Sequence, residues 1–246
     1  MNKFFQCKTE QKKVGMLTPS SNTVVEPVCS AMVSGLEDIV TMHYSRFRVT
    51  KISLESDSLN QFNIEPMLDA AKMLADADVD IISWNGTSGG WKGLDSDKRL
   101  CEIIEEETGI PATTSMQAQI KTMHEKNVSK INMVTPYTDD INELIIKEYK
   151  KNDIEVINSI GLHCSINRSF SCIPLEKILS SCKAVYSDKA QGLSVICTNF
   201  PAMKMVREIE ELGLPLFDTI NTLVYQNIKQ LGISTDLLSN WGKIFK

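Results

Sequence analysis

The segment Val14-Gly-Met-Leu-Thr-Pro-Ser-Ser-Asn22 recurs later in the chain as Ile131-Asn-Met-Val-Thr-Pro-Tyr-Thr-Asp139. Each copy is a short apolar run followed by Thr-Pro, hydroxyl residues, and an Asn or Asp of the type that starts a helix. Because proline ends the hydrogen-bonded ladder of a strand, both copies predict a buried strand that leads through a loop into a helix.

Two further segments repeat in the same order along the chain. Residues 82–88 resemble 193–199, and residues 107–111 resemble 211–215. Three matches in the same order argue for an internal duplication. We therefore predict an α/β fold of two lobes related by a pseudo-two-fold axis, each a mostly parallel sheet flanked by helices.

The pattern also predicts the organisation of the chain. We expect a polar N-terminal tail over 1–12, lobe 1 over 13–128 together with part of the C-terminal segment, lobe 2 over 129–225, and a C-terminal helical segment over 226–246. Strands are predicted at 14–19, 39–49, 79–84, 131–134, 154–157 and 193–196. Helices are predicted at 24–34, 64–76, 100–107, 111–121, 139–150, 174–183 and 203–212, with a last helix entered from 216–224.

Composition excludes several classes of protein. The 246 residues are 42% hydrophobic and 23% charged, which is typical of a globular domain, and a net charge of −5 disfavours a nucleic-acid binder. No apolar run is long enough for a membrane helix or a secretory signal. Seven cysteines without a CxxC pair argue against a disulfide framework or a zinc site. We expect a cytoplasmic protein without metal or cofactor, with homo-oligomerisation left open.

Four of the repeated loops follow predicted strands and should face one cleft, because ligands of open α/β sheets bind beyond the carboxyl ends of strands. Backbone N–H groups at helix starts and neutral hydroxyl donors there favour a carboxylate or a developing oxyanion. A thiol among them can exchange a proton. Taken singly, these residues are more typical of turns, helix caps and buried packing; their joint placement favours a site. The candidates are Ser20, Asn22, Gly86, Thr87, Ser88, Tyr137, Cys197 and Thr198.

These motifs resemble the aspartate/glutamate racemase superfamily, and within it the branch of maleate isomerases and arylmalonate decarboxylases. The resemblance rests on residues 19–26, 86–88, 109–114 and 135–143 and on the segment at Cys197. Racemases and maleate isomerases of this kind use two cysteines, one from each lobe. Here Gly86 stands where the first is expected and Cys197 matches the second, as in arylmalonate decarboxylases. The Pro-Ser-Ser-Asn-Thr stretch is instead more similar to maleate isomerases.

The resemblance implies a cofactor-independent decarboxylase of a substituted malonate-like dicarboxylate, whose enediolate is protonated by Cys197. Alternatives are a maleate cis–trans isomerase or an Asp/Glu-type racemase, and a non-catalytic binder of a small carboxylate. Two alternatives are open for Trp84 and Trp91, which flank the Gly86 loop: they line a cavity that accepts an aromatic group, or, as we favour, they are packing residues. By the resemblance, an oxyanion would be held by Thr87, Ser88, Tyr137 and the N–H of Thr198, a carboxylate by Ser20 and Asn22, and Gly86 would leave room for a substituent.

Overall fold

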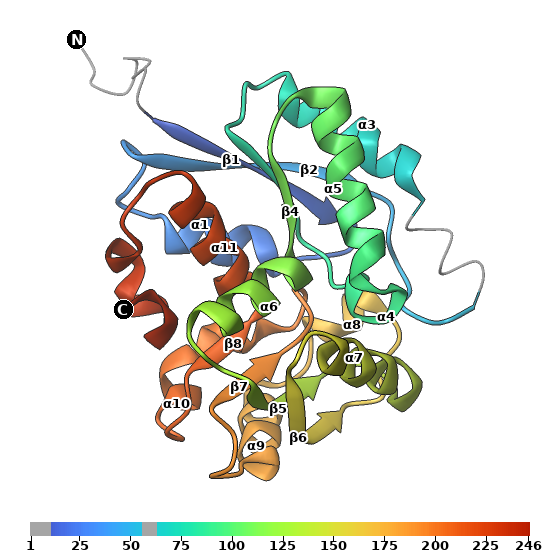
Figure 1. Ribbon diagram of the computed structural model, residues 1–246, viewed down its shortest axis with the longest axis vertical. Coiled ribbons are helices and arrows are strands. Elements are labelled where there is room, and N and C mark those ends of the chain that lie inside the picture. Colours follow the sequence, from blue (N-terminus) through green and yellow to red (C-terminus); the bar gives the residue numbers. More distant parts are fainter. Residues whose placement is uncertain (1–10, 56–62) are drawn as a thin grey trace.

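The computed structural model describes residues 11–55 and 63–246 and contains two four-stranded parallel sheets (Figure 1). The first sheet has the order β2-β1-β3-β4 and the second the order β6-β5-β7-β8, so the same succession of strands occurs twice. This repetition confirms the predicted two-lobe α/β fold. The strands are β1 (Lys12–Pro19), β2 (Val40–Phe47), β3 (Ile81–Trp84), β4 (Ala112–Thr114), β5 (Lys130–Thr135), β6 (Glu155–Gly161), β7 (Gly192–Val195) and β8 (Leu216–Asp218).

Helices flank both sheets. In lobe 1, α3 packs on β1 and β2 and α5 packs beside β4, while α1 contacts β2. In lobe 2, α7 packs on β6, and α9 packs on β5 and β6. The α-helices are α1 (Val25–Met32), α3 (Ile64–Ala75), α4 (Gly89–Lys92), α5 (Leu94–Thr108), α6 (Ser115–Glu125), α7 (Asp139–Lys151), α8 (Asn167–Phe170), α9 (Leu175–Val185), α10 (Val206–Glu210) and α11 (Thr219–Gln230). Short 3₁₀ helices span Pro201–Met205, Thr235–Trp241 and Lys243–Phe245.

Buried residues run continuously along the central strands because helices cover both faces of a parallel sheet. Val14, Met16 and Leu17 of β1 and Ile131, Met133 and Val134 of β5 are fully buried. The two copies of the repeated segment therefore form the central strand of each lobe and direct the following loops to the same edge.

Helices α6 and α11 pack against each other and tie the lobes together (Figure 1). Ser83 of β3 donates to Asn227 of α11 with an Oγ–Oδ1 distance of 2.9 Å. In the reverse direction, Gln119 of α6 donates to the carbonyl of Phe217 in β8 at 2.7 Å. Each lobe thus receives the last helix of the other, which fixes the relative position of the strand ends.

The structure corrects several predicted boundaries. Residues 112–114 and 216–218 form edge strands before the helices predicted to begin there; each is too short to show a strand pattern. The helix predicted at 203–212 is a 3₁₀ turn followed by α10, which ends at Glu210. Residue 225, the predicted end of lobe 2, falls inside α11.

The predicted tail over 1–12 lies outside the described residues up to residue 10, and Lys12 already belongs to β1. Within 11–55 and 63–246, no helix is long and apolar enough to cross a membrane.

Candidate active site

A small cavity lies where the loops after β1, β3, β5 and β7 converge. Its volume is about 20 Å³, which is room for about one water molecule. It brings together five of the predicted site residues, from both lobes. The lining consists of Pro19, Val49, Ile52, Trp84, Gly86, Thr87, Trp91, Tyr137, Asn167, Cys197 and Thr198.

Cys197 is the one cysteine in the described part of the chain that lines this cavity. It follows β7 with a backbone φ of +144°, a conformation that non-glycine residues adopt at a cost in strain and often at functional sites. Burial raises the pKa of its thiol to about 12, partly offset by hydrogen bonding from Tyr137 and from the N–H groups of Asn199 and Phe200. The thiol therefore holds its proton at neutral pH.

Thr87 and Tyr137 meet across the cavity, one from each lobe. Their hydroxyls are hydrogen-bonded, with 2.7 Å between Oγ1 and Oη, and both side chains are buried. Burial, followed by the nearby Cys197, raises the pKa of Tyr137 well above its ordinary value. Tyr137 thus stays a neutral hydroxyl beside the thiol, able to donate a hydrogen bond to an anion.

Thr198 is held by a buried chain of hydrogen bonds. Asn22 Nδ2 donates to Thr198 Oγ1 at 3.1 Å, and that hydroxyl donates to the carbonyl of Asn85 at 2.9 Å. Asn22 Oδ1 accepts from the N–H groups of Val24 and Val25 at the start of α1. The amide of Asn22 therefore connects the lobes behind the cavity and does not line it.

Ser20 and Ser88 also lie outside the lining. The exposed Ser20 is hydrogen-bonded through its Oγ to the backbone of Val49, whose N–H donates at 3.2 Å. Ser88 Oγ accepts from Trp84 Nε1 at 3.4 Å. Both serines are placed as supports of the loops rather than as groups facing the cavity.

Sequence reasoning missed the loops that close the cavity from the side. Lys51 and Ile166 form an antiparallel bridge between the lobes, and Ile52 N–H donates to the carbonyl of Ser165 at 2.8 Å. Beside this bridge, Asn167 is buried, donates through Nδ2 to Ser21 Oγ at 2.9 Å, and lines the cavity. No motif in the sequence signals these contacts, because they join irregular segments more than a hundred residues apart.

The space expected beside Gly86 is occupied by Trp84. A Cβ atom built on Gly86 would lie 2.0 Å from Cζ2 of the Trp84 indole. The indole is buried and packs on Phe47, with 5.0 Å between ring centroids. Trp84 and Trp91, for which the sequence left both packing and a cavity-lining position open, both border the cavity.

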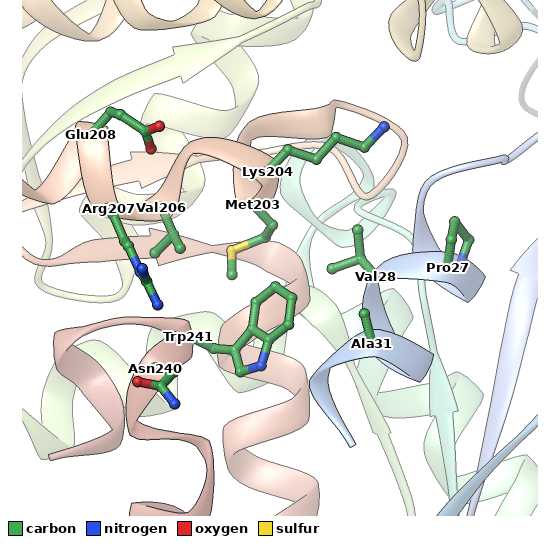
Figure 2. A pocket seen from close by; sticks show the side chains of 10 residues that line it. All are labelled: Pro27, Val28, Ala31, Met203, Lys204, Val206, Arg207, Glu208, Asn240 and Trp241. Carbon is green, nitrogen blue, oxygen red and sulfur yellow. The ribbon is translucent and has the colours of Figure 1, made fainter. Parts of the chain in front are cut away.

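A much larger cavity, of about 500 Å³, lies elsewhere, between α1, α10 and the 3₁₀ helix ending at Trp241 (Figure 2). Val28, Met203 and Trp241 converge on it, and it contains no cysteine. We place the candidate active site at the smaller cavity, because a thiol there meets hydroxyl and amide groups from both lobes. Among the described residues, no cluster of His, Cys, Asp or Glu is arranged to hold a metal ion.

The duplicated α/β fold, with a buried thiol at the junction of the lobes, agrees with the resemblance to the aspartate/glutamate racemase superfamily seen in the sequence. The model of the arylmalonate decarboxylase family matches residues 14–245. The chain belongs to that family.

Similarity extends to maleate isomerases. The Alcaligenes faecalis maleate isomerase is 24% identical over 233 residues, covering 91% of this chain and 92% of that protein. The Bordetella bronchiseptica arylmalonate decarboxylase is 20% identical over 186 residues, covering 74% and 78%. Among solved structures, Nocardia farcinica maleate cis–trans isomerase bound to TRIS superposes with a TM-score of 0.88 at 19% identity, covering 95% of this chain and 97% of that one. An arylmalonate decarboxylase structure gives 0.74 at 18% identity, covering 95% and 98%.

Proposed function

We propose that the protein is a cofactor-independent decarboxylase of a small substituted malonate-like dicarboxylate. The observation that carries this proposal is the asymmetry of the cavity. Cys197 supplies a protonated thiol from lobe 2, whereas the corresponding position of lobe 1 is Gly86, covered by an indole. Decarboxylation needs one proton donor, while proton exchange on two faces needs two.

In this reaction the bond between Cα and one carboxylate breaks, CO₂ leaves, and the electron pair passes into an enediolate of the retained carboxylate. The hydroxyls of Thr87 and Tyr137 line the cavity, and in this proposal they are the neutral donors that stabilise its oxyanion. The S–H bond of Cys197 then breaks as a C–H bond forms at Cα, and water returns a proton to the thiolate. Protonation from one side yields a product of single handedness.

The size of the cavity limits how the substrate enters. A diacid is larger than a space of about 20 Å³. Binding therefore requires the loops joined by the Lys51–Ile166 bridge to move apart, and the apolar side chains of Val49 and Ile52 lie on that side of the cavity. We infer a compact substituent on the substrate.

Maleate isomerisation is the second candidate. It is favoured by similarity to maleate isomerases from Alcaligenes faecalis and Geobacillus stearothermophilus, 24% and 25% identical over 91% of this chain. A cysteine variant of the Nocardia farcinica enzyme was solved with a covalently bound succinylcysteine intermediate. In this chain such an adduct at the cavity would have to form on Cys197, whose pKa of about 12 leaves little thiolate to attack.

The test is a panel of substituted malonates, maleate and amino diacids, with CO₂ release and product handedness measured for the wild type, Cys197→Ala and Cys182→Ala. Cys182 is the matched control, because it is a buried lobe 2 cysteine whose pKa burial also raises to about 12. We expect the rate of malonate decarboxylation to fall about 10²–10⁴-fold in Cys197→Ala and to stay unchanged in Cys182→Ala.

The other outcomes each overturn this function. Turnover of maleate without turnover of malonates would establish the isomerase instead. Binding of diacids without turnover would establish a non-catalytic carboxylate binder.

A further inference from the structure

The two lobes differ in one coupled pair of residues at the cavity. In the duplicated segments 82–88 and 193–199, Trp84 corresponds to Val195 and Gly86 to Cys197. Residues two apart at a strand end point to the same side. Lobe 1 therefore has the large indole of Trp84 and no side chain at Gly86. Lobe 2 has the small branched side chain of Val195 and the thiol of Cys197.

We propose that Trp84 is the residue that determines the specificity of the single-thiol reaction, by filling the volume that a second thiol in lobe 1 would occupy. The inference rests on the proposed function for its chemical consequence and on the geometry of Gly86 for its steric part. Burial alone would indicate only a packing role for Trp84.

The geometry leaves no space for a side chain at position 86. A Cβ atom there would lie 2.0, 2.3 and 2.6 Å from Cζ2, Cε2 and Cη2 of Trp84, far inside van der Waals contact. The indole cannot simply swing aside, since it packs on Phe47 and its Nε1 donates to Ser88. Overpacking of this kind is destabilising because displaced side chains leave their rotamers.

The chemical consequence follows from what the indole offers. The N–H of Trp84 is directed to Ser88, so the ring presents carbon atoms to the lobe 1 side of the cavity. It has no proton to give to an enediolate and no base to remove one. Among the described residues, Cys197 is then the one thiol that lines the cavity and can carry a proton to Cα, so a product once formed is not racemised.

The experiment is a double-mutant cycle between Trp84→Val, which copies Val195 of lobe 2, and Gly86→Cys. Thermal unfolding is measured without substrate. Racemisation of a 2-substituted carboxylic acid is measured by chiral analysis, with deuterium uptake from D₂O. In racemisation, the thiolate at position 86 would take the Cα proton while Cys197 delivers its own to the other face.

We expect Gly86→Cys alone to lower the unfolding temperature by roughly 3–10 °C and to show no racemisation. In the Trp84→Val background, Gly86→Cys should lower the unfolding temperature only slightly. The double variant should racemise the 2-substituted acid. Trp91→Val is the matched control. Trp91 borders the same cavity, but none of its atoms is among the three nearest to the Gly86 Cβ position. Trp91→Val should therefore not reduce the fall in unfolding temperature caused by Gly86→Cys.

The role of Trp84 would be overturned by additive changes in unfolding temperature, or by racemisation in Gly86→Cys alone. A stable double variant that decarboxylates malonates but does not racemise would also overturn it. A different outcome is that the wild type decarboxylates no malonate while the unfolding temperatures still show coupling between positions 84 and 86. That outcome would refute the proposed function but not the steric role of Trp84.

Discussion

Replacing Tyr137 with phenylalanine removes one hydroxyl from the centre of the candidate site while keeping the ring. That hydroxyl is hydrogen-bonded to Thr87 Oγ1 at 2.7 Å and interacts with the thiol of Cys197. The ring itself packs edge-on against Trp91 and Phe170, with centroids 5.4 and 5.5 Å away, and these contacts are preserved. The substitution therefore isolates the hydroxyl from its packing.

Two effects of different size are expected. Removing one donor from an oxyanion site lowers kcat about 10²–10³-fold, equivalent to roughly 3–4 kcal/mol in the transition state. Leaving the buried Thr87 hydroxyl without this partner costs about 1–3 kcal/mol of stability. The first effect appears in turnover and the second in unfolding, so the two measurements separate them.

Tyr149→Phe provides the matched control. Tyr149 is equally buried in lobe 2, and its hydroxyl donates to Gln119 Oε1 at 2.5 Å and is hydrogen-bonded to Ser194 Oγ at 2.7 Å. It does not line the cavity. Both variants should lose similar stability in urea unfolding, but only Tyr137→Phe should lose kcat with a substrate found in the panel. A fall in kcat no larger than that of Tyr149→Phe would refute the oxyanion role.

Two further predictions concern pH. Because burial raises the pKa of Cys197 to about 12, the thiol stays protonated, and kcat for decarboxylation should show no alkaline fall between pH 7 and about 10; a fall near the ordinary thiol pKa of 9.0 would contradict a buried donor. Burial also raises the pKa of Asp97 from 3.8 to about 7, so the folded state retains a proton that the unfolded chain releases, and this group makes stability decline as pH rises through that window. Asp97→Asn keeps an acceptor for the Thr114 hydroxyl. In urea unfolding, its free energy of unfolding should rise relative to that of the wild type between pH 5 and pH 8, by up to about 1.4 kcal/mol per pH unit. If the difference in free energy of unfolding between variant and wild type is the same at both pH values, the raised pKa of Asp97 is refuted.

The duplication made the lobes and the centre of the candidate site predictable from sequence. Strand-end loops of a parallel sheet converge by geometry, so Thr87, Tyr137, Cys197 and Thr198 could be expected together without any knowledge of packing. The edge strands β4 and β8 could not, because three residues show no periodicity and are defined by pairing with β3 and β7.

The residues that shape the cavity depend on packing, which the sequence does not state. Strand alternation places residues 84 and 86 on one side, but the contact of Phe47 and Ser88 with the indole orients Trp84 over Gly86. Asn167 reaches the cavity through a bridge between two irregular loops. Asn22, predicted to bind a carboxylate, is engaged by its own helix start and by Thr198, a use that short-range sequence reasoning does not reveal.

The small cavity at the junction of the lobes connects these observations to the proposed chemistry. Desolvation raises the pKa of Cys197 and of Tyr137 together, which keeps both groups neutral and able to donate. The same desolvation would disable Cys197 as a nucleophile, because addition to an alkene requires thiolate. In an open cleft, water would hydrate the thiolate and lower the thiol pKa, which would favour nucleophilic attack over proton donation. For the proposed reaction, closure of the loops held by the Lys51–Ile166 bridge therefore keeps Cys197 a proton donor, and the indole of Trp84 confines that donation to one side.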